Sequence, residues 1–188
     1  MSIQSPIIIN KFYHHHQLKE KLLNLIDKSD SDQILNNTLD KFIKLDWNKS
    51  NNFERPWVKY INTYLYNQLI SMVSKIGFNS IHINDLWYQQ YGKNGQHNWH
   101  IHADNFTGVY YVELENDQYT QLLNPYNLNE AYSYKVQEGD FIVFPSYIIH
   151  RSGINITDKT RTIISYNFNV KESNKEVLKN RIIKLITI

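Results

Sequence analysis

The sequence contains no cysteine, and this absence limits its chemistry. Without thiols the chain can form neither a disulfide nor an iron–sulfur cluster, and it has neither a thiolate zinc ligand nor a thiol nucleophile. A metal ion would have to be held by histidine, carboxylate or backbone oxygen, and the 188 residues include 8 His and 18 Asp and Glu. The lack of cysteine leaves the redox compartment open, because such a chain folds in either setting.

Long apolar runs and an excess of charge of one sign are also missing. No apolar stretch approaches the roughly 18–20 residues needed to cross a bilayer, since the longest candidate, 141–149, is interrupted by Pro145 and Ser146. Residues 1–9 lack the basic and apolar regions of a secretory signal. The 20 Lys and Arg nearly balance the 18 Asp and Glu, which argues against a nucleic-acid or acidic-membrane partner. We expect a soluble, cytoplasmic protein.

The remaining composition fits one domain over the whole chain, because 41% of the residues are hydrophobic, enough for a full core. Residues 1–79 predict a short strand followed by supporting helices, of which the last begins near Pro56 and ends at Gly77. Residues 80–170 consist of short apolar runs divided by turn residues, which predicts strands. Residues 171–188 form a C-terminal extension with the pattern of a helix or a strand.

Eight strands are expected in the second region. They cover residues 80–91, 98–102, 106–114, 119–123, 132–136, 140–144, 148–151 and 161–169. Short strands at this spacing are typical of a sandwich, a barrel or a jelly roll. The apolar face of the preceding helices would back the larger sheet. The predicted fold class is therefore mainly β with N-terminal helices.

Residues 99–104, Trp-His-Ile-His-Ala-Asp, form the most informative motif. Side chains two residues apart in a strand share a face, so His102 and Asp104 would point the same way with Cα atoms about 6.6 Å apart. An imidazole nitrogen and a carboxylate oxygen placed in this way can bind one ion at about 2.0–2.2 Å. A second histidine from a later strand would complete a face of two histidines and one carboxylate, which suits non-haem Fe(II) oxygenases. His100 lies on the same face, where it would be an alternative ligand, a partner of a ligand or a substrate contact.

His150 is the expected second histidine. It closes the apolar segment 139–150, where a polar side chain needs a partner or a ligand. Arg161 begins the strand 161–169, and a guanidinium at the head of a buried strand needs an anionic partner. The two residues therefore predict a metal ligand and an anion site.

In this order, His102-x-Asp104, His150 and Arg161 resemble the motif of the 2-oxoglutarate/Fe(II)-dependent dioxygenases. The similarity is greatest to the prolyl-4-hydroxylase-like branch and its short stand-alone members from viruses and bacteria. The flanking residues match as well: Tyr91-Gly92, Gly108-Val-Tyr-Tyr-Val112 and Gly139-Asp-x-x-x-Phe-Pro-Ser146. The resemblance covers roughly residues 80–170 and implies a double-stranded β-helix, the jelly roll of cupin-like proteins.

The resemblance implies a role for each matching residue. The Fe(II) ligands would be His102, Asp104 and His150. Arg161 would pair with the distal carboxylate of the co-substrate 2-oxoglutarate, with the hydroxyl of Tyr111 as a second donor. Tyr91 would lie beside the end of the co-substrate that chelates the metal.

Strand alternation adds Ser165 and Asn167 to the face of Arg161, where they would line the pocket. One position departs from the family pattern, because Ile163 stands where the family often has serine, which affects a hydrogen bond to the co-substrate. Asp104 favours hydroxylation, since halogenating relatives have a small residue in place of this carboxylate.

The implied activity is hydroxylation of an unactivated C–H bond by O₂, with decarboxylation of 2-oxoglutarate to succinate. The substrate would be peptidyl, with prolyl residues among the candidates, or a small molecule. A non-catalytic jelly-roll binding module and a metal-dependent cupin-type enzyme that does not use 2-oxoglutarate are the alternatives. Repair of alkylated nucleic acid is disfavoured, because no basic groove is evident.

Overall fold

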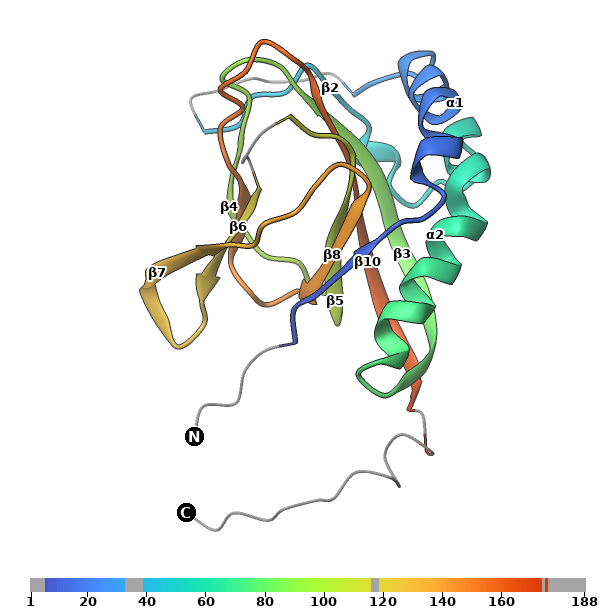
Figure 1. The fold of residues 1–188 in the computed structure, drawn as a ribbon, viewed down its shortest axis with the longest axis vertical. Helices are drawn as coiled ribbons and strands as arrows, with labels where there is room; N and C mark the ends of the chain where they lie inside the picture. The colour runs from blue at the N-terminus through green and yellow to red at the C-terminus, as the bar shows by residue number, and fades with distance from the viewer. Residues whose placement is uncertain (1–5, 33–38, 116–118, 174, 176–188) are drawn as a thin grey trace.

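A computed structural model describes residues 6–32, 39–115, 119–173 and 175 (Figure 1). Within these residues the strands are β1 (Ile8–Lys11), β2 (Lys44–Leu45), β3 (Phe78–Tyr91), β4 (His97–His100), β5 (Phe106–Glu113), β6 (Thr120–Asn124), β7 (Asn127–Ser133), β8 (Asp140–Pro145), β9 (His150–Ser152) and β10 (Arg161–Ser173). The helices are α1 (His15–Asp27), the short 3₁₀ helix η1 (Trp47–Lys49) and α2 (Pro56–Ser74). None of these helices combines the length and apolarity needed to span a membrane.

The strands form two antiparallel sheets, which confirms the expected jelly roll. The major sheet has the strand order β1-β8-β5-β10-β3-β2, and the minor sheet has the order β4-β9-β6-β7. Both helices pack against the outer face of the major sheet, and the minor sheet lies on its other side (Figure 1). The inner faces of the two sheets enclose the space in which a site can form.

Helix α2 follows the signals that predicted it. Pro56 occupies its first turn, where the missing N–H costs nothing, and Gly77 after its end has a φ of 100°, which a glycine adopts without strain. Its buried side chains recur every three or four residues and are Trp57, Val58, Ile61, Leu65, Leu69, Met72 and Val73. Each fully buried side chain of this size contributes about 1.5–3 kcal/mol, so this stripe fixes the helix to the sheet.

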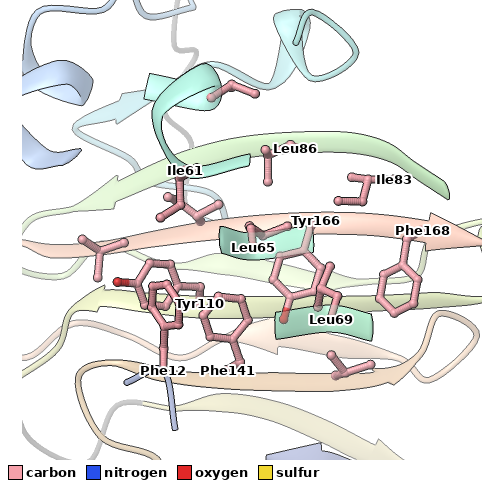
Figure 2. Packing of buried hydrophobic residues seen from close by; sticks show 14 of the residues in the cluster. Phe12, Ile61, Leu65, Leu69, Ile83, Leu86, Tyr110, Phe141, Tyr166 and Phe168 are labelled. Atoms are coloured by element: carbon pink, nitrogen blue, oxygen red, sulfur yellow. The ribbon is translucent and has the colours of Figure 1, made fainter. Parts of the chain in front are cut away.

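Alternation along β10 separates two cores. Ile164, Tyr166 and Phe168 face the helices and pack with Tyr110 and Phe141 (Figure 2). The alternate residues of the strand, Arg161, Ile163, Ser165 and Asn167, face the minor sheet. The strand that completes the outer core therefore presents its other face to the interior of the jelly roll.

Each of the eight expected strands differs from the observed strand at one end or at both. The strand expected at 98–102 is β4, which runs from His97 to His100. The strand expected at 132–136 begins earlier, as β7, which runs from Asn127 to Ser133. It follows β6 closely and pairs with it as an antiparallel hairpin. The expected C-terminal element at 171–188 falls almost entirely outside the described residues.

Candidate metal and co-substrate site

Three histidines meet at the inner face of the minor sheet. His100 ends β4, His102 follows it and His150 begins β9. One potential ligand atom of each ring lies within 4.8 Å of the others. The pairing of β4 with β9 sets His100 directly opposite His150, and the centroids of these two rings are 4.3 Å apart. The ring of His102 lies 5.0 Å from His100 and 5.2 Å from His150.

Two of these rings have a defined tautomer. The Nδ1 atom of His100 donates to the carbonyl oxygen of Asn98 at 2.6 Å, and Nδ1 of His150 donates to that of Ile148 at 2.9 Å. A carbonyl oxygen only accepts, so both Nδ1 atoms carry hydrogen and both Nε2 atoms keep a lone pair. Histidines that bind metals are commonly fixed in this way by a backbone carbonyl.

Burial keeps the cluster neutral. It lowers the pKa of His102 to about 4, with His100 as a further cause. The pKa of His150 is well below its ordinary value for the same two reasons, and burial also lowers the pKa of His100. At neutral pH these rings carry no proton that a metal ion would have to displace.

Asp104 does not join the three histidines. Its Oδ1 atom accepts hydrogen bonds from the side-chain amides of Asn84 and Asn169, the second at 3.1 Å. The expected alternation does not apply to His102 and Asp104, because β4 ends at His100 and the following residues turn. The spacing of two residues instead brings His100 and His102 together.

Arg161 lies at the head of β10, opposite Tyr91 of β3. Only 3% of its surface is exposed, and its guanidinium carbon lies 4.4 Å from the centroid of the Tyr91 ring. Its Nη2 atom donates to Oγ of Ser152 at 2.7 Å and to the carbonyl oxygen of Gly153 at 2.8 Å. Burial lowers the pKa of Arg161, but a guanidinium stays charged in proteins.

Tyr111 is buried beside this group. Its hydroxyl donates to Oγ1 of Thr120 at 2.8 Å and accepts from the backbone N–H of Thr120 at 3.2 Å. Burial raises the pKa of Tyr111, while the nearby charge of Arg161 opposes the shift. Tyr111, which the resemblance places with Arg161, therefore has a hydrogen-bond partner of its own in Thr120. Tyr91, which the resemblance places at the metal-chelating end of the co-substrate, lies with its ring against the guanidinium of Arg161.

A pocket between the sheets connects the two groups. Its lining includes the three histidines together with Tyr91, Ser152, Ile163 and Ser165. Tyr91 and Ser152 are contacts of Arg161, so the guanidinium lies directly behind this wall. Among the described residues that line the pocket, none is Asp or Glu. The lining therefore has no negative charge that would repel an anionic ligand.

The cluster is surrounded by further residues that the sequence motifs did not include. His97 stacks on His100 with centroids 4.1 Å apart, and burial lowers its pKa to about 3. The ring centroids of Trp87 and Trp47 lie 5.7 Å and 6.3 Å from that of His102. Trp47 is 40% exposed, so the two indoles form an edge of the site. In the sequence, only the nearness of His97 to the motif 99–104 could have indicated a place beside the cluster. The two tryptophans come from segments farther away in the chain and gave no such indication.

Comparison with known proteins defines the fold but gives no family by sequence. No family model matches the chain, and no curated protein matches it. Among solved structures it is similar to a Trichoplax adhaerens prolyl hydroxylase in complex with a peptide fragment of hypoxia inducible factor, with a TM-score of 0.65 and 17% identity over 95% of this chain and 89% of that one. The viral collagen prolyl hydroxylase of Paramecium Bursaria Chlorella virus-1, in a 2-oxoglutarate complex, gives a TM-score of 0.58 and 14% identity over 86% and 94% of the two chains.

A third structure, HygX from Streptomyces hygroscopicus with nickel and 2-oxoglutarate bound, gives a TM-score of 0.64 and 8% identity over 87% of this chain and 82% of that one. At such identities the similarity shows the fold. The chain thus has the double-stranded β-helix on which 2-oxoglutarate oxygenases are built, and its chemistry must be argued from its own residues.

Proposed function

We propose that this protein is a 2-oxoglutarate- and Fe(II)-dependent dioxygenase that hydroxylates an unactivated C–H bond. One observation carries the proposal: three neutral histidines converge at one side of a pocket that has a buried arginine behind its wall. The fold adds support, because similar structures hold 2-oxoglutarate, one of them with nickel.

The metal ligands in this proposal are His100, His102 and His150. His100 takes the position that the resemblance gave to Asp104. Three imidazole nitrogens on one side of an ion leave adjacent positions open for a chelating 2-oxo acid and for O₂. Neutral ligands also leave the two positive charges of the ion uncompensated, and a dianionic co-substrate would balance them.

The anchor for the co-substrate is Arg161, with Tyr91 and Tyr111 beside it. A guanidinium binds a carboxylate through parallel N–H donors, and burial strengthens this attraction. The hydroxyl of Ser152 already accepts from this guanidinium, which holds it in a fixed orientation. Ile163 lies on the same pocket wall, so an apolar contact replaces the hydrogen bond that a serine would make.

Bound iron would supply the activation of O₂, with 2-oxoglutarate converted to succinate and CO₂ while one oxygen atom enters the substrate. The residues of this chain hold the reactants and restrict the entry of water, and no protein acid or base is needed. For the substrate we propose a peptidyl residue, prolyl among the candidates, since a similar structure is a prolyl hydroxylase solved with a peptide. A small-molecule substrate is the alternative.

The test is an anaerobic titration followed by turnover. Fe(II) and 2-oxoglutarate added to the metal-free protein are expected to give a visible charge-transfer band, and O₂ is then expected to yield succinate. The band and the succinate should both disappear in His102→Ala. A protein that binds Fe(II) but gives neither the band nor succinate contradicts the proposal.

The all-histidine ligand set also favours a second candidate, a metal-dependent cupin-type enzyme that does not use 2-oxoglutarate, because three histidines with an open position suit metal-assisted hydrolysis too. Arg161 separates the two functions. Activity that survives in Arg161→Ala supports the second candidate. Loss of both activity and 2-oxoglutarate binding in this variant supports the first.

A further inference from the structure

Two of the four tryptophans lie beside the histidine cluster, and no Lys or Arg of the described residues lies over their rings. Trp47 and Trp87 meet edge to face, with ring centroids 4.4 Å apart and planes inclined by 77°. The other two tryptophans each have an arginine over the ring, in the pairs Arg55–Trp57 and Arg151–Trp99. An indole face attracts a cation more strongly than a tyrosine or phenylalanine face does. In the described part of the chain, Trp47 and Trp87 are therefore the tryptophans that can still receive a cation.

Trp47 is held in place although 40% of it is exposed. The residue before it, Asp46, is fully buried. This carboxylate accepts hydrogen bonds from the side chains of Arg55 and Trp57 and from the backbone N–H of Tyr88, the last two at 3.0 Å and 2.8 Å. A large ring that is exposed and yet fixed in this way loses little freedom when a ligand binds to it, which favours binding.

A carboxylate lies beside the two indoles. Asp85 comes two residues before Trp87 in β3, so the two side chains share the inner face of the strand. Its Oδ1 atom accepts from Oγ of Ser50 at 2.8 Å, and the backbone N–H of Ser50 donates to the carbonyl oxygen of Trp47 at 2.9 Å. Its Oδ2 atom lies 3.4 Å from Nδ2 of Asn167. These partners are neutral, and no ion pair joins Asp85 to a Lys or Arg of the described residues.

Charges of opposite sign lie toward the two ends of the inner face of β3. Arg161 is opposite Tyr91 at one end, and Asp85 comes six positions earlier (91 − 85), which corresponds to about 20 Å along a strand. The ring of Trp87 lies 5.7 Å from that of His102, so the Asp85 end reaches the histidine cluster. In a partly desolvated cavity these charges separate ligands by sign, with an anion at Arg161 and a cation at Asp85.

We propose that Trp47, Trp87 and Asp85 bind the ammonium or guanidinium group of a lysyl or arginyl side chain in the substrate. The inference rests on the proposed function, because it assigns a selecting group to the substrate of that enzyme. Two indole faces attract the cation, and the carboxylate compensates its charge. None of the three residues is a proposed metal ligand or part of the anion site, so the cation site can be tested on the metal-free protein.

The test measures the binding of blocked peptides Ac-Gly-Gly-X-Gly-Gly-NH₂ to the full-length, metal-free protein by calorimetric titration. The residue X is Lys, Arg, norleucine, Pro or Glu. The lysyl and arginyl peptides are expected to bind at least about tenfold more tightly than the norleucyl peptide, which has an apolar stem without the charge. This preference should decrease as salt is added, because salt screens the partly exposed charges. Equal affinity for the lysyl, norleucyl and prolyl peptides would show an apolar wall and overturn the proposal.

Substitutions locate the preference. Asp85→Asn removes the charge and keeps an oxygen for Ser50, so the lysyl peptide should lose most of its advantage over the norleucyl peptide, and Asp85→Glu should retain it. Trp47→Leu removes the exposed indole and is expected to weaken binding of the lysyl peptide about fivefold. Trp99→Leu is the matched control, because the ring of Trp99 already lies under Arg151, and it should bind the peptides like the unmodified protein. If Trp47→Leu does not fold, the two Asp85 variants carry the test.

The outcomes separate the two proposals. An unchanged lysyl preference in Asp85→Asn overturns the cation site, whatever the metal titration shows. Absence of the charge-transfer band and of succinate overturns the dioxygenase. A lysyl preference that disappears in Asp85→Asn and persists in Asp85→Glu still supports the cation site in that case, as the site of a binding protein.

Discussion

His100 and His150 are directly opposed residues of two neighbouring antiparallel strands, and each ring is held by the carbonyl of the residue two positions before it. This arrangement leaves the Nε2 lone pair of each ring free, with the carbonyl for His100 supplied within β4 and that for His150 supplied by Ile148 in the segment between β8 and β9. The third ring, His102, belongs to the irregular segment that follows β4, and it contacts Asn167 of the major sheet.

The first prediction separates the ligand roles of His100 and Asp104. His100→Ala is expected to weaken Co(II) binding at least about 100-fold, as removal of a direct ligand must cost more than loss of its partner. Asp104→Ala should leave Co(II) affinity nearly unchanged and lower the free energy of unfolding by about 1–3 kcal/mol, because Asn84 and Asn169 lose their acceptor. Calorimetric titration and urea unfolding measure the two effects. The reverse result would show that Asp104 rotates into the site when the metal binds.

A second prediction concerns pH. In the folded protein the pKa of His102 is about 4 and that of His97 about 3, whereas the ordinary value is 6.5. At a pH between the folded and the ordinary pKa of each histidine, the unfolded chain therefore binds more protons than the folded one. Stability is therefore expected to be full above pH 6.5 and to fall as the pH drops toward 4. The limiting slope is about 1.4 kcal/mol per pH unit for each such histidine.

Urea unfolding of the metal-free protein across this range measures the slope. His102→Asn should flatten the profile, because it removes one of the groups that bind protons only when unfolded. A profile equally steep in the variant would attribute the pH dependence to other residues, among them His15, whose pKa burial also lowers.

The sequence predicts the supports of this site better than it predicts which side chains cluster in it. Pro56 and Gly77 mark α2, and alternation along β10 puts Arg161, Ser165 and Asn167 on one face, as the structure has them. These signals are local and depend only on backbone geometry and periodicity.

The choice between His100 and Asp104 is not local. Both lie two residues from His102, so alternation favours neither. The outcome depends on where β4 ends, and the backbone N–H of His102 leaves the ladder to donate to the carbonyl oxygen of Ser146 at 3.1 Å. Such a contact, like that between Asp85 and Asn167, joins segments far apart in the chain and leaves no trace in the motif.

A third prediction tests the anion site. Arg161→Gln removes the charge and is expected to weaken 2-oxoglutarate binding at least about 30-fold, since loss of one partner of a buried charge pair costs about 2–5 kcal/mol. Co(II) affinity in the absence of 2-oxoglutarate should stay unchanged, because Arg161 lies behind Tyr91 and Ser152 and not in the histidine cluster. Competition with succinate in the Co(II)-loaded protein measures the effect. Equal 2-oxoglutarate affinity in the variant would place the anion elsewhere.

The last prediction concerns Gly108, the first residue of the motif 108–112. A Cβ atom there would lie 2.1 Å from the carbonyl oxygen of Ile142 and 2.7 Å from the ring of Tyr166, so β5 and β8 would have to separate. Gly108→Ala is expected to lower the free energy of unfolding by about 1–3 kcal/mol or more, as overpacking against backbone does. Gly153→Ala is the matched control, because its Cβ would meet nothing closer than 3.5 Å and should change stability little. Urea unfolding compares the two variants, and equal midpoints would show that the sheet yields at Gly108 without cost.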